Sequence, residues 1–154
     1  MGVNTDERGA SGQAQRMSGR DEREARTQFA ERYAIATGDV NDRIERSVIG
    51  AVWGANGYTT VAQADELGRQ LDLAPGRRLL DVGTGRGWPG LYLAARTGCA
   101  LVGTDMPLGA LGTAGRRAKA ENIQDRVALV AAGGAEQPFR RASFDAIVLT
   151  DVLC

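Results

Sequence analysis

A run of alternate glycines follows a short apolar segment, and these residues are the ones best suited to hold a ligand. The segment is Leu79–Val82, and the glycines after it are Gly83, Gly85 and Gly87. Glycine adopts backbone angles closed to other residues and lets a ligand approach the main chain. The pattern therefore predicts a loop whose backbone contacts a bound molecule.

Two acidic residues accompany this loop. Asp81 stands two positions before the first glycine, and Asp105 ends the next apolar run, Ala100–Thr104. In open α/β sheets ligands bind outside the carboxyl ends of the strands, and an acid at the end of the second strand is placed to accept hydrogen bonds from a ribose diol. The two acids and the loop together predict a nucleoside-type site. Asp105 also has a simpler explanation, as the cap of a helix opened by Pro107.

The elements needed to position these residues alternate between strands and helices. Strands are expected at 78–82, 100–104, 127–131 and 144–150, with helices beginning near Pro89 and Pro107. This alternation is typical of a doubly wound parallel sheet. The nearly continuous apolar run 146–149 predicts a strand covered on both faces. Residues 132–143 are expected to form a loop, with at most one helical turn.

The residues before this α/β part have a different pattern. Residues 1–20 are polar and are expected to form a disordered tail, and residues 21–74 form an N-terminal helical segment. Apolar spacing predicts one helix with Phe29, Tyr33 and Ala36 inward and a second that continues through Val52 to Gly54. Thr60 and Gln63 resemble a capping box that opens a third helix. Residues 75–154 form the remaining domain.

Composition excludes several classes of function. Lys+Arg and Asp+Glu both number 19, which argues against a dedicated nucleic-acid binder. The chain contains no histidine, so histidine-based triads and most catalytic zinc sites are excluded. No apolar run approaches the ~20 residues of a membrane span, and no secretory signal is found. The distant Cys99 and Cys154 fit a reducing compartment, and a cytoplasmic location is expected.

The spacing of the glycines separates two classes of cofactor. The dinucleotide fingerprint requires a third glycine where this chain has Trp88. The sequence Asp81 to Gly87 instead resembles motif I of the class I S-adenosylmethionine-dependent methyltransferases. The resemblance continues through 102–105, 134–139 and 144–148. It implies a Rossmann-like parallel sheet, here partial with strand order 3-2-1-4, preceded by an N-terminal helical layer.

The resemblance also implies roles for individual residues. Asp81 and the loop would hold the methionine end of S-adenosyl-L-methionine, Asp105 the ribose, and Met106 the adenine face. Many relatives have an aspartate at the position of Gly134, so adenine contacts are left to Ala135 and Glu136. The cofactor-binding residues expected from the resemblance are Asp81, Gly83, Thr84, Gly85, Gly87, Asp105, Met106, Ala135 and Glu136.

Several alternatives stay open at this point. Asp151, after the fourth strand, is the candidate base if the acceptor must lose a proton. Tyr58 either covers the helical layer or lies over the ligand, and Trp88 belongs either to the core or to the substrate site. The expected function is methyl transfer to a small molecule. The alternatives are a truncated, inactive cofactor-binding fragment and a nicotinamide-dependent oxidoreductase. The strand at 144–150 is expected to be an exposed edge that favours self-association.

Overall fold

The computed structural model describes residues 38–55, 57–134 and 137–152. The predicted tail over 1–20 and the predicted helix containing Phe29, Tyr33 and Ala36 lie outside the described residues, as do Ala135, Glu136 and Cys154. All statements below refer to the described part of the chain.

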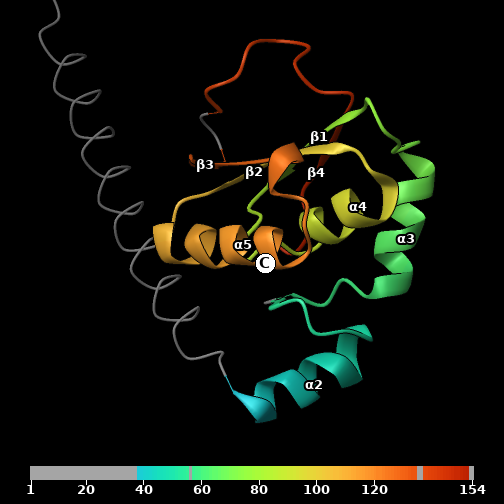
Figure 1. Cartoon of the computed structure of the whole chain (residues 1–154), viewed down its shortest axis with the longest axis vertical. Coiled ribbons are helices and arrows are strands. Elements are labelled where there is room, and N and C mark those ends of the chain that lie inside the picture. The colour runs from blue at the N-terminus through green and yellow to red at the C-terminus, as the bar shows by residue number, and fades with distance from the viewer. Residues whose placement is uncertain (1–37, 56, 135–136, 153–154) are drawn as a thin grey trace, which may run out of the picture.

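A parallel sheet organises the fold. Its strands are β1 (Arg78–Val82), β2 (Ala100–Asp105), β3 (Val127–Ala131) and β4 (Ala146–Val148), and they lie in the order β3-β2-β1-β4 (Figure 1). In the register, Asp81 is opposite Gly103 of β2 and Val148 of β4. The Rossmann-like α/β fold and the partial strand order expected from the sequence are confirmed.

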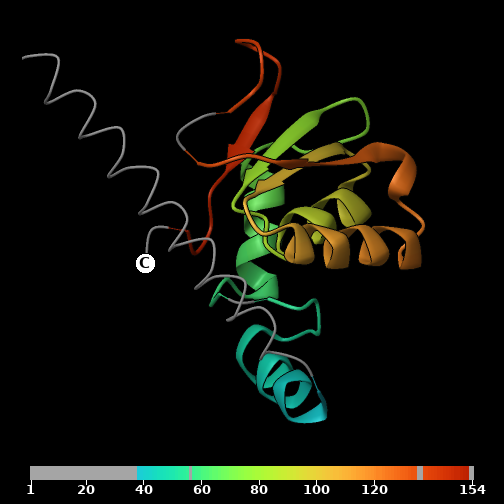
Figure 2. The same cartoon turned by 90° about the vertical axis from the view of Figure 1, so that its left-hand side faces the viewer.

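Two helices cover one face of this sheet. Helices α4 (Gly90–Thr97) and α5 (Leu108–Ala120) lie on the same side of the strands in Figures 1 and 2. The chain steps in one direction from β1 to β2 to β3, so right-handed crossovers place both connecting helices on one face. A short 3-10 helix, η1 (Gln124–Arg126), leads into β3. This arrangement brings the carboxyl ends of β1 and β2 to the same edge, beside the start of α4.

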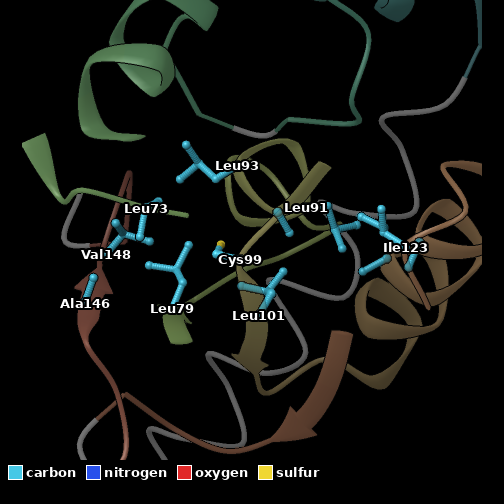
Figure 3. Close-up of a cluster of buried hydrophobic side chains, with 12 residues drawn as sticks. Leu73, Leu79, Leu91, Leu93, Cys99, Leu101, Ile123, Ala146 and Val148 are labelled. Atoms are coloured by element: carbon cyan, nitrogen blue, oxygen red, sulfur yellow. The ribbon is translucent and has the colours of Figure 1, made fainter. Parts of the chain in front are cut away.

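The main hydrophobic core lies between the sheet and these two helices. Leu79 and Leu101 extend from β1 and β2 toward Leu91 and Leu93 of α4, and all four are almost fully buried (Figure 3). Cys99 lies in the same cluster and is buried. Burial also raises the pKa of its thiol. This core fixes the two strand ends that carry Asp81 and Asp105.

The fourth strand is shorter than predicted, but its exposure agrees with the expected open edge. The strand spans Ala146–Val148 rather than 144–150. Ala146 and Val148 are buried, but Ile147 and Leu149 are 55% and 53% exposed. The described part of the connection from β3, residues 132–134 and 137–145, forms no helix that could cover this face. The edge strand therefore presents one apolar face to solvent.

The helices before the sheet were partly predicted. Helix α2 (Asp39–Ile49) ends before Gly50, not at Gly54 as expected. Gly50 has φ 90°, and its N–H donates to Arg46 O, which closes the last turn. Helix α3 (Val61–Gln70) begins with the expected capping box between Thr60 and Gln63.

The two helices contact the α/β part to different degrees. Gly68 of α3 lies against Leu93 of α4, since a Cβ at position 68 would be 3.3 Å from a Leu93 methyl carbon. Helix α2 lies farther from the sheet in both views (Figures 1 and 2) and buries mainly Ile49. None of the helices in the described ranges is long and apolar enough to cross a bilayer.

Candidate functional site

The glycine loop begins as a continuation of the sheet. The backbone N–H groups of Gly83 and Thr84 both donate to Thr104 O, at 2.8 and 2.9 Å. The chain then turns away, with φ values of 75°, 55° and 102° at Gly83, Gly85 and Gly87. Residues with side chains rarely adopt these angles. The turn directs the chain from the carboxyl end of β1 into α4.

Asp81 lies beneath this loop and not on its surface. Its Oδ2 accepts hydrogen bonds from Thr84 Oγ1 at 2.7 Å and from Gly90 N at 3.1 Å, and the residue is 1% exposed. Burial raises the pKa of the carboxyl to about 7, against the lowering effect of the two donors. A Cβ at position 90 would overlap this carboxylate, so the start of α4 requires glycine there. The contacts shown for Asp81 join β1, the loop and α4.

Asp105 connects the end of β2 to the glycine loop. Its Oδ2 accepts from Gly85 N and its Oδ1 from Met106 N, each at 2.7 Å. Burial raises the pKa of this carboxyl, while the two backbone donors lower it. The alternative explanation as a helix cap is wrong, because no side chain caps α5 and Pro107 occupies the N-cap position. Asp105 instead fixes the loop relative to β2.

The turn after β3 lies over the same edge of the sheet. A Cβ at Gly133 would be 3.9 Å from Met106 Sδ, and one at Gly134 would be 3.9 Å from a Val82 methyl carbon. Gln137 Nε2 donates to Gly133 O at 2.7 Å, while its buried Oε1 has no hydrogen-bond partner. Met106 and this turn thus approach each other beside Asp105. Ala135 and Glu136 lie outside the described residues, so their expected roles stay predictions.

Asp151 lies at the end of β4 and bonds to the segment before α3. Its Oδ2 accepts from Thr59 Oγ1 at 2.8 Å and from Thr59 N at 3.2 Å. Asp151 was a candidate from the sequence, whereas Thr59 was not. The nearest sequence signal, the capping box at Thr60, explains the start of α3. It does not predict that Thr59 bonds to a residue 92 positions later in the chain.

The two aromatic candidates behave differently. Trp88 is 7% exposed and packs with Trp53 and Tyr92, at ring-centroid distances of 6.2 and 5.3 Å. It therefore belongs to a buried cluster. Its Nε1 donates to Thr59 O at 2.9 Å. Tyr58 is 79% exposed, so it does not cover the helical layer.

Arg86 was missed by the sequence analysis, although it lies within the glycine loop. It is 8% exposed, and its Cδ would be 3.2 Å from a Cβ at Gly54. The segment before α3 therefore packs along the loop at more than one point.

A separate groove lies between α3 and α4, away from the glycine loop. It has a volume of about 580 Å³ and is lined by charged residues that include Asp65 and Arg96. Tyr92 Oη donates to Asp65 at 2.7 Å, and Arg96 lies 4.0 Å from the same carboxylate. These groups neutralise one another, so the groove lacks the convergent unpartnered donors of a ligand site. The described residues include no cluster of possible metal ligands.

Comparisons with known proteins find similarity to methyltransferases. Residues 79–154 match a family model described as a methyltransferase domain. A methyltransferase of Streptomyces halstedii named GfsG is 35% identical over 83 residues, which cover 54% of this chain and 30% of that protein. The 27-O-demethylrifamycin SV methyltransferase of Amycolatopsis mediterranei is 33% identical over 88 residues, covering 57% and 32%.

A solved structure supports the same relationship. The S-adenosylmethionine-dependent methyltransferase of Thiobacillus denitrificans, in complex with S-adenosyl-L-homocysteine, is 25% identical to this chain with a TM-score of 0.56. The match covers 70% of this chain and 42% of that one. This chain spans about a third of the length of the curated relatives it matches.

Proposed function

We propose that this chain, which over residues 79–154 belongs to the class I S-adenosylmethionine-dependent methyltransferases, binds S-adenosylmethionine at the glycine loop and serves methyl transfer to a small-molecule acceptor. The observation that carries the proposal is the bond from Gly85 N to Asp105 Oδ2. It joins the loop after β1 to the acid after β2 at the carboxyl ends of the strands, where open α/β sheets bind their ligands.

The residues present fit this cofactor. A carboxylate offers about four acceptor positions, and the structure fills one on each Asp105 oxygen, which leaves capacity for the two ribose hydroxyls. Met106 supplies an apolar surface next to the turn after β3. Ala135 and Glu136 remain proposed contacts for the adenine ring.

The glycine loop is proposed to hold the methionine end. Gly83, Thr84, Gly85 and Gly87 place backbone groups at the start of α4, where the positive end of the helix dipole favours a carboxylate. Asp81 is proposed to act on the cofactor through this loop, because its own carboxylate is buried against Thr84 and Gly90. When bound, S-adenosylmethionine supplies an electrophilic methyl group. The contribution of this chain is to bind and orient it.

The acceptor is proposed to be a small organic molecule. One relative is named for its action on 27-O-demethylrifamycin SV, which is a small molecule. The balanced charge of this chain also disfavours a polyanionic acceptor such as nucleic acid. A cytoplasmic location remains an expectation from the sequence.

Cofactor preference is the direct test of this proposal. We expect isothermal titration to show binding of S-adenosylmethionine and S-adenosylhomocysteine and no binding of NAD, because Trp88 occupies the position of the third dinucleotide glycine. Binding of NAD alone would support the nicotinamide-dependent oxidoreductase and overturn the methyltransferase assignment. Binding of S-adenosylhomocysteine without turnover of any acceptor would favour the alternative of a cofactor-binding fragment.

Self-association through β4 is a further expectation. The exposed face of this edge strand carries Ile147 and Leu149, and unprotected edges pair with other chains. Light scattering after size exclusion should show a mass that rises with concentration, and Ile147→Lys should lower it. Val40→Lys, at a 66% exposed position on α2, is the matched control and should leave the mass unchanged. A wild-type monomer at every concentration would rule out this edge as an association site.

A further inference from the structure

Residues 57–60, which we call the strap, lie between the end of β4 and the residue that follows the glycine loop. From one side, Trp88 Nε1 donates to Thr59 O at 2.9 Å. From the other side, Asp151 Oδ2 accepts from Thr59 N at 3.2 Å and Thr59 Oγ1 at 2.8 Å. Figure 2 shows the chain after β4 running toward the segment that precedes α3. Thr59 therefore bonds to the α/β part through its backbone N–H, its hydroxyl group and its carbonyl oxygen.

Steric contacts hold the same three segments together. A Cβ at Gly57 would overlap the Asp151 side chain, so the strap approaches this carboxylate closely. A Cβ at Gly83 would lie 2.5 Å from a methyl carbon of Val152, so the next residue packs on the glycine loop. Asp151 itself has φ 56°, a left-handed conformation that persists in non-glycine residues where neighbouring contacts enforce it. Two consecutive residues after β4 thus contact the other segments: Asp151 contacts the strap, and Val152 contacts the glycine loop.

We infer that Asp151 is a positioning residue that holds the strap against the glycine loop as a wall of the cofactor site. The inference rests on the proposed function for the identity of the ligand. Oδ2 of Asp151 accepts two hydrogen bonds from Thr59, so losing this carboxylate would release the strap.

Amide hydrogen exchange at Thr59 tests the contact without any ligand, because this N–H is donated to Asp151. In the unliganded chain, Asp151→Ala should accelerate exchange of the Thr59 amide by about tenfold or more through local opening. Asp151→Asn keeps a carbonyl oxygen that accepts from Thr59 but cannot serve as a base, so exchange should stay within about threefold of wild type.

Two further variants make the test independent of one substitution. Gly57→Ala places a methyl group where the Asp151 side chain lies and should accelerate Thr59 exchange as Asp151→Ala does, with both bonding residues still present. The matched control is Asp125→Ala. Asp125 is an exposed residue of η1, next to β3, and β3 and β4 lie at opposite edges of the sheet. This variant should leave Thr59 exchange unchanged. A thermal melt of each variant confirms that the fold is kept.

Titration with S-adenosylhomocysteine connects the strap to the site. We expect Asp151→Ala and Gly57→Ala to weaken binding about three- to tenfold and Asp151→Asn to bind like wild type. Unchanged Thr59 exchange in Asp151→Ala would overturn the inference. A second result would also overturn it: Asp151→Asn no longer binds S-adenosylhomocysteine, while the Thr59 amide stays protected from exchange. Asp151 would then contact the ligand directly. If the wild-type chain binds no S-adenosylhomocysteine, the proposed function fails, while the exchange measurements still decide whether Asp151 holds the strap.

Discussion

Replacing Asp105 with alanine should weaken binding of S-adenosylhomocysteine by at least about tenfold, a loss of about 1.4 kcal/mol. The side chain is expected to accept hydrogen bonds from both ribose hydroxyls, and bonds to a charged group contribute about 1.5–3 kcal/mol each before non-additivity. The two carboxylate oxygens also accept hydrogen bonds from the backbone N–H groups of Gly85, in the glycine loop, and of Met106, the next residue in the chain. Isothermal titration of the variant measures the loss.

The conservative variant separates the two contributions of Asp105. Asp105→Asn keeps one carbonyl oxygen, which can accept from Gly85 N, but it loses the charge and one acceptor. We therefore expect its affinity to lie between wild type and Asp105→Ala. An Asp105→Ala protein that folds and binds S-adenosylhomocysteine with wild-type affinity would show that the carboxylate serves the loop alone.

Asp81 should make the stability of the fold depend on pH between about 4 and 7. Burial raises the pKa of its carboxyl in the folded chain to about 7, whereas an aspartate in an unfolded chain titrates near 3.9. Below about pH 4 the group is protonated in both states. As the pH rises toward 7, the unfolded chain releases the proton first, so this group's contribution to the free energy of unfolding is lost.

Asp81→Asn should remove this dependence, because the amide cannot ionise. The free energy of unfolding of the variant, relative to wild type, should therefore increase by about 2–4 kcal/mol between pH 4 and pH 8. Urea titrations of both proteins across this range measure the difference. Thr84→Val, which removes a hydrogen bond that lowers the Asp81 pKa, should extend the dependence to higher pH. Parallel curves for wild type and Asp81→Asn would mean that Asp81 is ionised in the fold.

The sequence by itself determined the order of the elements and the location of the glycine loop. Strands β1 and β3 begin and end close to the positions expected from apolar runs, and helices α4 and α5 begin close to Pro89 and Pro107 as expected. These features are local: a strand of buried residues, a glycine with φ 76° that ends α4, and the Thr60–Gln63 capping box each depend on a few neighbouring residues. The resemblance of the glycine loop and its acids to one family followed from the same local spacing.

Only the tertiary structure decided which groups these residues contact. The carboxylate of Asp81 faces inward to Thr84 and Gly90, and Asp105 bonds to Gly85, because the sheet register brings the ends of β1 and β2 together. The pairing of Asp151 with Thr59 joins positions far apart in the chain, and no local spacing encodes it. The exposed face of β4 agrees with the expected edge strand, and it follows from the absence of a covering helix in the described part of the connection before it. Burial and hydrogen bonding between segments that are distant in the sequence depend on how the elements pack, so no local sequence pattern encodes them.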